Sequence, residues 1–495
     1  MKPLMPKANM QDIASSKRHG RFYFKTAVVL VAVAAIAHLF LGARVVVVLL
    51  GVAITLLSLL PIVYFGVFNL AAILIALLGI RYAGFPIFAK LFMGQPLDLF
   101  LIDPIGSFAV VLVGILSYLG AFWTASKCSI GRPLLHQTLD QAVLARISIL
   151  AAAVGIAANL AMALRAGEEY SGITIAEFFA SFLHLALIAG IARAIVASNR
   201  RSGVDSFVIV IVIAELVFGM VRNSRVTLIE TLLCFVITVS AFEYKIRWRS
   251  FGMVYIFMVM MVIFITPVFL YVRSFHGQLS WTARIAATMD AAVNWPDTFS
   301  YFLQYRDKRD QLGWYLNYYG SHQNVFERLS LVNHVDVLKS GVDAWQTVGF
   351  EDLSMSLERV MPRALAPNKP RDFSQGYWLY SGIGIQYPGP FATSPLIGTG
   401  YAAFSWIGSF LYPFVLGFAW ILIIKKMTGW ELHNNVWVIY MLLRIQNQFV
   451  EGSSDAYLIY ILRSLPQDFI ILWILNAVGR WHIINSWPKI PMIQN

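Results

Sequence analysis

The chain has 495 residues, of which 58% are hydrophobic and 13% are charged. Soluble globular domains carry about 25% charged residues, so this composition excludes a soluble protein and indicates an integral membrane protein. The formal net charge of +12 would suggest nucleic-acid binding in a soluble protein. Here the basic residues gather in short connections between apolar runs, as membrane topology requires, and no nucleic-acid partner is expected.

Apolar runs of span length predict the transmembrane helices. In chain order these runs cover residues 26–43, 45–61, 66–80, 104–123, 147–164, 174–192, 206–221, 226–243, 251–271, 397–424, 434–450 and 466–479. We therefore predict an all-α polytopic membrane protein with about twelve transmembrane helices and one large, mainly helical loop outside the membrane. The first run follows a basic segment and lacks a small-residue cleavage site, which predicts a retained helix and not a signal peptide.

The positive-inside rule orients these spans. The basic residues fall in alternate connections, which predicts that both termini lie inside, in the cytoplasm, and that the long polar segment lies outside. The predicted parts are a cytoplasmic tail (1–25), a bundle of about nine helices (26–271), a large outer loop (272–395), a bundle of about three helices (396–480) and a second cytoplasmic tail (481–495).

Two stretches interrupt the apolar pattern. The stretch from Arg81 to Asp103 is aromatic and broken by prolines, and we expect an interfacial segment there. The stretch from Ser453 to Asp468 mixes tyrosines, an arginine and a proline, which predicts a re-entrant or surface helix before the last span.

The first candidate site lies around two arginines at a tight turn between spans. Glu215 interrupts an apolar run, and Arg222 follows two helical turns later on the same face. Arg225 stands at the turn, and Glu230 lies one turn into the next span. Arginines at membrane edges often only snorkel to lipid headgroups. Buried ionisable groups nearby favour anion binding.

A second candidate group forms one polar stripe on a membrane helix. Arg444, Asn447, Gln448 and Glu451 fall at helical spacing. Such a stripe faces the interior of the bundle or a wet cavity, because lipid is an expensive neighbour for it. The alternative is interhelical contact, with Glu451 pairing Arg444 across two turns.

The third group closes the long polar loop. Arg359, Arg363, Lys369 and Arg371 gather there, and prolines stiffen the backbone between them. Arginine pairs bidentately with phosphate, so a fixed basic cluster beside the membrane suits a lipid-linked pyrophosphate. A solvated loop surface would also carry arginines.

Other chemistry has little support in the sequence. No P-loop or dinucleotide-binding glycine pattern precedes a helix, so no ATP or NAD cofactor is expected. The two cysteines fall in a loop and a span, which predicts neither a disulfide nor a metal site. His276, His322 and His334 lack metal-ligand spacing, and His38 and His184 are expected to bond neighbouring helices.

The stretch MPRALAPNKP (Met361–Pro370) resembles the Wzy-type repeat-unit polymerases of O-antigen and exopolysaccharide synthesis. The return into the membrane at Gly398–Gly417 is similar to their glycine- and aromatic-rich helix, and Arg222 with Arg225 resembles their basic site. The O-antigen ligases share this architecture and add an outer-loop histidine that no motif matches here, which favours a polymerase over a ligase.

This resemblance implies a GT-C-like membrane glycosyltransferase that acts on undecaprenyl-pyrophosphate-linked oligosaccharides at the outer leaflet. The growing chain would leave its lipid carrier and join a hydroxyl of the next lipid-linked unit, without a cofactor or metal. Membrane lipid, a chain-length regulator and a flippase are the further partners that it suggests. A transporter or flippase of lipid-linked glycan is the alternative from another class, although we see no internal repeat.

The expected roles follow from the chemistry of a pyrophosphate leaving group, which guanidinium groups stabilise while a carboxylate accepts the proton of the attacking hydroxyl. Pyrophosphate binding is assigned to Arg222, Arg225 and Arg363, with support from Arg359, Lys369 and Arg371. Arg444, Asn447 and Gln448 are expected to contact substrate. The candidates for the general base are Glu215, Glu230 and Glu451.

Overall fold

The computed structural model describes residues 10–135, 139–164, 176, 179–222, 225–244, 252, 256, 264–273, 281–309, 318–320, 329–361, 375–385 and 394–485. Within these ranges the regular structure is helical, apart from one isolated antiparallel bridge between Asn69 and Glu431. The chain forms two compact units that interleave along the sequence. Unit 1 comprises Met1–Pro133, Arg306–Glu431 and Ile445–Gln467, and unit 2 comprises Leu134–Tyr305, Leu432–Arg444 and Asp468–Asn495.

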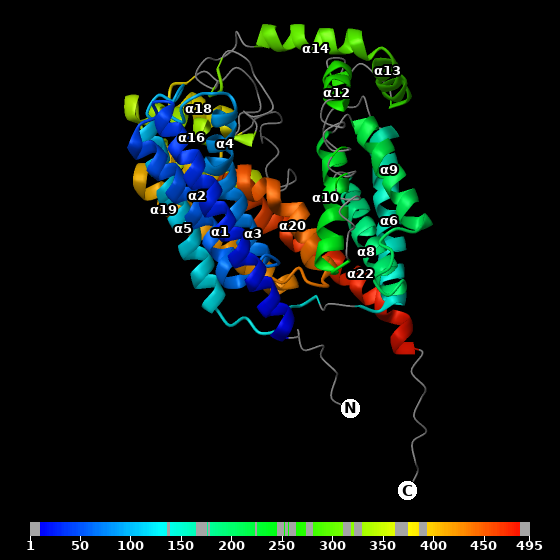
Figure 1. Ribbon diagram of the computed structural model, residues 1–495. Helices are drawn as coiled ribbons and strands as arrows, with labels where there is room; N and C mark the ends of the chain where they lie inside the picture. The colour runs from blue at the N-terminus through cyan, green and yellow to red at the C-terminus, as the bar shows by residue number, and fades with distance from the viewer. Residues whose placement is uncertain are drawn as a thin grey trace. The chain divides into compact units, whose positions relative to one another are not determined.

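Unit 1 is built on the N-terminal helices and the long helix that follows the polar segment 272–395. In Figure 1 the blue α1 and α2 and the cyan α5 lie side by side, and α19 packs against α5. The helices of this unit are α1 (Met10–Phe40), α2 (Val45–Phe65), α3 (Leu70–Gly79), the π-helical turn η1 (Ile80–Gly84), α4 (Phe85–Phe92), α5 (Pro104–Lys127), α16 (Val332–Ala344), α17 (Glu351–Val360), α18 (Gln375–Gly382), α19 (Leu396–Thr428), α21 (Ser454–Ile459) and the π-helical turn η5 (Tyr460–Ser464).

Unit 2 is centred on α8, which packs against α6, α9 and α10 (Figure 1). A glycine permits one of these contacts: a Cβ at Gly155 on α6 would lie 2.6 Å from the backbone nitrogen of Leu183 on α8. The unit contains α6 (Gln141–Leu164), α8 (Phe182–Ala197), α9 (Ser206–Arg222), α10 (Arg225–Ala241), α12 (Thr266–Arg273) and α13 (Trp281–Val293), most of α14 (Trp295–Arg309) and α22 (Leu465–Asn485), and the part of α20 (Val436–Glu451) up to Arg444.

Seven helices are long and apolar enough to cross a membrane, and α8, α9 and α10 contribute three shorter apolar stretches within the described residues. The prediction of an all-helical, membrane-embedded protein is therefore confirmed. The number twelve stays a prediction, because the run 251–271 falls largely outside the described residues and α20 is not among the seven. Each unit takes helices from both of the predicted ranges 26–271 and 396–480, and that division of the chain stays a prediction.

Two π-helical turns replace the interruptions that the sequence indicated. From Leu70 to Phe92 the helix is continuous through η1, and the last span continues from α21 through η5 into α22. Each turn is followed by a proline, Pro86 or Pro466. Proline lacks an N–H and clashes with the preceding turn of an α-helix, and the wider π turn relieves both problems. The predicted interfacial segment from Arg81 is therefore helical as far as Phe92, and the stretch from Ser454 is continuous with the last apolar helix.

Helix α19 bends sharply near its start. Ser405 has a φ of 54° and interrupts the helical conformation. The backbones on either side of the bend touch, because a Cβ at Gly408 would lie 1.9 Å from the carbonyl oxygen of Gly400. The bend also frees the carbonyl of Ala402, which accepts a hydrogen bond of 2.9 Å from the N–H of Val348. The glycines of this stretch therefore let the polar segment attach to the membrane helix.

Candidate functional site

Four ionisable side chains from three helices of unit 2 meet among apolar surroundings. Glu215 and Arg222 lie on α9, Glu230 lies on α10 and His184 lies on α8. The Nε2 atom of His184 is 3.4 Å from Oε1 of Glu215 and 3.9 Å from Oε2 of Glu230. Glu215 is only 2% exposed. The predicted association of Glu215, Arg222 and Glu230 is thus present in the structure, with an imidazole between the two carboxylates.

A second guanidinium completes this cluster. Arg444 on α20 has its Nε atom 3.9 Å from Oδ2 of Asp468 on α22, and that carboxylate is fully buried. Arg222 and Arg444 both lie within electrostatic range of Glu230 and of His184. We call these six residues the unit 2 cluster: His184, Glu215, Arg222, Glu230, Arg444 and Asp468.

The helix geometry explains how the sequence builds the cluster. Glu215 and Arg222 are two turns apart and project from one face of α9, as their spacing predicts. The neighbouring helices α8 and α10 pack on α9, which brings His184 and Glu230 to that face. Charges removed from water need partners, and here opposite charges supply them.

The chemistry available to the cluster is anion binding and proton transfer. Each guanidinium presents five N–H donors in a planar fork that suits phosphate oxygens. Carboxylates and an imidazole accept and release protons. Ionisable groups among apolar membrane helices are candidate functional sites by default, because they are costly to bury. This cluster is therefore the strongest candidate site in unit 2.

The remaining part of the predicted stripe on α20 belongs to unit 1. Asn447 is exposed and Gln448 is half-buried. Glu451 accepts a hydrogen bond of 2.5 Å from Arg81, so the suggested pairing of Glu451 with Arg444 is wrong. Residues two turns apart on a helix are separated by about 10 Å along its axis, and each found a partner on another helix.

Arg81 connects η1 to the polar segment as well as to Glu451. Its Nε donates to the carbonyl of Leu329 at 2.9 Å, and its own carbonyl accepts from the N–H of Leu331 at 3.1 Å. Burial and the nearby Arg81 charge lower the pKa of His334 to about 4. The half-buried His334 ring places Nδ1 3.3 Å from the hydroxyl of Tyr380.

Arg359 is the one described member of the third predicted group. Its guanidinium donates to Asp455 on α21 at 2.5 Å, and both side chains are largely buried. On the same face of α17, Asp352 accepts a hydrogen bond of 2.8 Å from Ser454. These contacts attach α17 to the start of α21. Arg363, Lys369 and Arg371, like the side chain of Arg225, lie outside the described residues, so their predicted roles stay predictions.

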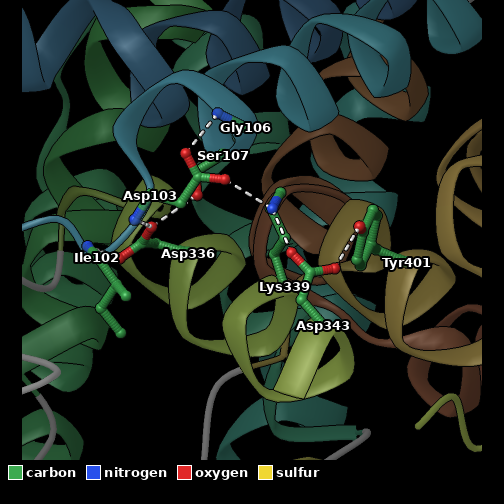
Figure 2. Close-up of polar contacts among 8 residues, drawn as sticks. All are labelled: Ile102, Asp103, Gly106, Ser107, Asp336, Lys339, Asp343 and Tyr401. Carbon is green, nitrogen blue, oxygen red and sulfur yellow. Dashed lines mark hydrogen bonds and ion pairs between the residues drawn. The ribbon is translucent and has the colours of Figure 1, made fainter. Parts of the chain in front are cut away.

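A separate polar network fastens α16 to the start of α5 (Figure 2). Asp336 accepts hydrogen bonds from the N–H of Ile102 at 2.6 Å, the N–H of Asp103 at 2.9 Å and the hydroxyl of Ser107 at 2.7 Å. Burial raises the pKa of Asp336, although these three hydrogen bonds oppose the shift. A carboxylate from α16 thus satisfies donors at the N-terminus of α5, where unpaired N–H groups gather.

Lys339 extends this network toward α19. Its ammonium lies 2.7 Å from Asp103 and 2.5 Å from Asp343, which in turn accepts from the Tyr401 hydroxyl at 2.9 Å (Figure 2). The hydrogen bond from Lys339, together with one from Gly106 N–H, lowers the pKa of Asp103 against the opposing effect of burial. Burial opposes protonation of Lys339, but its two carboxylate partners raise the pKa of the ammonium.

Sequence reasoning missed two residues of the unit 2 cluster and the partner of Glu451. His184 was expected only to bond a neighbouring helix, and Asp468 and Arg81 were assigned to interrupted segments. Each is an ionisable residue beside or inside an apolar run, which is the same signal that singled out Glu215. That signal, applied to every run, finds them.

Comparisons of the chain with protein-family models, curated proteins and solved structures find no significant match. Among the residues that the structure describes, no group of three or more His, Cys, Asp or Glu side chains has the arrangement of a metal site. The geometry of the unit 2 cluster is therefore the main basis for a functional proposal.

Proposed function

We propose that the chain is a membrane glycosyltransferase that polymerises undecaprenyl-pyrophosphate-linked oligosaccharide repeat units into O-antigen or exopolysaccharide. It would work at the outer leaflet of the bacterial inner membrane, with about twelve spans in a GT-C-like arrangement. The observation that carries the proposal is the unit 2 cluster, in which Arg222 and Arg444 lie near Glu215 and Glu230 among apolar helices. The resemblance at Met361–Pro370 supports the same substrate class.

In this reaction the bond between the anomeric carbon and the pyrophosphate oxygen of the donor breaks. A hydroxyl oxygen of the next lipid-linked unit forms the new glycosidic bond, and its proton passes to Glu215 or Glu230. Negative charge grows on the departing polyprenyl pyrophosphate, where Arg222 and Arg444 stabilise it. Loss of one such donor lowers the rate by about 10²–10³.

Binding and positioning are assigned to the other predicted residues. Arg225, Arg363, Lys369 and Arg371 would hold the lipid-linked diphosphate, which an Arg- and Lys-rich surface suits. Arg359 would act indirectly, because its guanidinium already holds Asp455. A chain-length regulator and a flippase are the further partners that we propose.

A second candidate is a transporter of lipid-linked glycan. One observation favours it: His184, Glu215 and Glu230 of the cluster lie within the apolar stretches of α8, α9 and α10. Transporters place charged binding groups within the membrane in this way.

The length of the surface glycan in a gene deletion distinguishes these functions. Loss of a polymerase leaves single repeat units on the final acceptor. Loss of a ligase leaves polymer on its lipid carrier, and loss of a transporter traps repeat units on the cytoplasmic side. We expect single units, and complementation by the wild type but not by Glu215→Gln. Either of the other two patterns would exclude the polymerase.

A further inference from the structure

His184 lies between two carboxylates in the interior of unit 2. Its Nε2 atom is 3.4 Å from Glu215 and 3.9 Å from Glu230, and its side chain is 13% exposed. Nε2 of His184 and Oε1 of Glu215 are both buried, and neither makes a hydrogen bond among the described atoms. Two buried polar atoms at this distance that lack a hydrogen-bond partner are both satisfied when one proton lies between them.

The charge balance of the cluster points the same way. Its three carboxylates, Glu215, Glu230 and Asp468, carry −3 when ionised, and Arg222 and Arg444 carry +2. The described groups therefore sum to −3 + 2 = −1. An unbalanced charge among apolar helices is expensive. One proton added to the cluster brings the sum to zero.

The described titratable and charged groups on the helices around His184 add no further charge to this sum. Besides Glu215 and Arg222, helix α9 presents apolar residues, and α10 presents Glu230 and the buried thiol of Cys234. Helix α20 contributes Arg444 and Tyr440, whose hydroxyl lies 3.1 Å from that of Ser181. The charged side chain of α6, Arg146, donates instead to the carbonyl of Gly479.

We infer that His184, Glu215 and Glu230 form a proton-binding site that holds one proton between the imidazole and the two carboxylates. The ligand is the proton itself, so the inference does not depend on the glycosyltransferase proposal. In a polymerase the carboxylate that this proton leaves ionised would receive the proton of the attacking hydroxyl. Glutamine at position 184 keeps a polar group of similar reach but does not titrate.

Infrared difference spectroscopy of the purified full-length protein in lipid vesicles tests this site directly. The probe is the proton, added by a pH jump in H₂O and in D₂O, and the readout is the C=O band of protonated carboxyl groups. We expect a band that Glu215→Gln and Glu230→Gln each reduce and that His184→Gln shifts. His38→Gln is the matched control, because His38 is also buried but its Nε2 atom lies 2.8 Å from the carbonyl oxygen of Ile87.

A band that His184→Gln leaves unchanged would overturn the inference, as would a band that persists in both glutamate variants. If a variant fails to fold, NMR of isotopically labelled histidine in the wild-type protein answers the question without substitution. A shared proton gives one ring nitrogen a shift between those of the neutral and charged forms. A ring nitrogen that stays fully neutral across the range in which the carboxyl band changes would contradict the site. Neither readout requires glycan synthesis, so failure of the polymerase proposal is recorded separately.

Discussion

Replacing Asp336 should weaken the attachment of α16 to the N-terminus of α5. The three hydrogen bonds that the Asp336 carboxylate accepts determine how much the free energy of unfolding falls. Asp336→Ala leaves two backbone N–H groups and the Ser107 hydroxyl without this acceptor. A hydrogen bond to a charged group contributes about 1.5–3 kcal/mol. Burial of the carboxylate, which raises its pKa, offsets part of this gain. We therefore expect a loss of about 3 kcal/mol in the free energy of unfolding.

Two further variants calibrate this value. Ser107→Ala removes one of the three donors and should cost about 1 kcal/mol, and Asp336→Asn, which keeps one acceptor oxygen, should fall between. Equilibrium unfolding in mixed detergent micelles gives the three differences. Because the folded-state pKa of Asp336 is raised, the wild type should lose stability as the pH rises from the ordinary aspartate pKa through the folded value. Asp336→Asn should lack this slope. Equal losses for Asp336→Ala and Ser107→Ala would refute the proposed role of this carboxylate.

The two other contacts of the polar segment give predictions of their own. Lys339→Met should destabilise the protein near neutral pH. The folded-state pKa of Asp103 is lowered, so the stabilising effect of this carboxylate is lost as the pH falls through that pKa, and the difference between Lys339→Met and the wild type should shrink in acid. A pH-independent difference in unfolding free energy would contradict the ion pair. Arg359→Ala should cost about 2 kcal/mol, and a double-mutant cycle with Asp455→Ala should show a positive coupling between them. If Arg359 instead binds substrate, its replacement will lower activity far more than Asp455→Ala does at equal stability.

Much of the fold could be predicted because each membrane span corresponds to a local apolar stretch of the sequence. An unbroken apolar run of span length has few alternatives to a membrane helix. The π turns η1 and η5 were not predictable in this way. Pro86 and Pro466 signal a break in any local reading, and only packing against neighbouring helices keeps the chain helical through them.

The candidate site was predictable only within one helix and its immediate neighbour. The spacing of Glu215 and Arg222 on α9, followed by Glu230 eight residues later, is a local pattern. His184 and Asp468 reach the cluster through helix pairings that no local spacing encodes. The same holds for Glu451, whose partner Arg81 is distant in sequence. Periodicity identifies which face of a helix is polar, but tertiary packing decides which partner that face meets.

The most direct test of the proposed function is polymerisation by the purified protein in vesicles that contain undecaprenyl-pyrophosphate-linked repeat units. We expect the wild type to extend these units in the presence of EDTA. Arg222→Ala should lower the rate by about 10²–10³ without loss of folded protein. Arg200→Ala, which removes an exposed arginine paired with Glu243 at 2.6 Å in the same unit, should be as active as the wild type. Full activity of Arg222→Ala, or no extension by the wild type, would contradict catalysis at the unit 2 cluster.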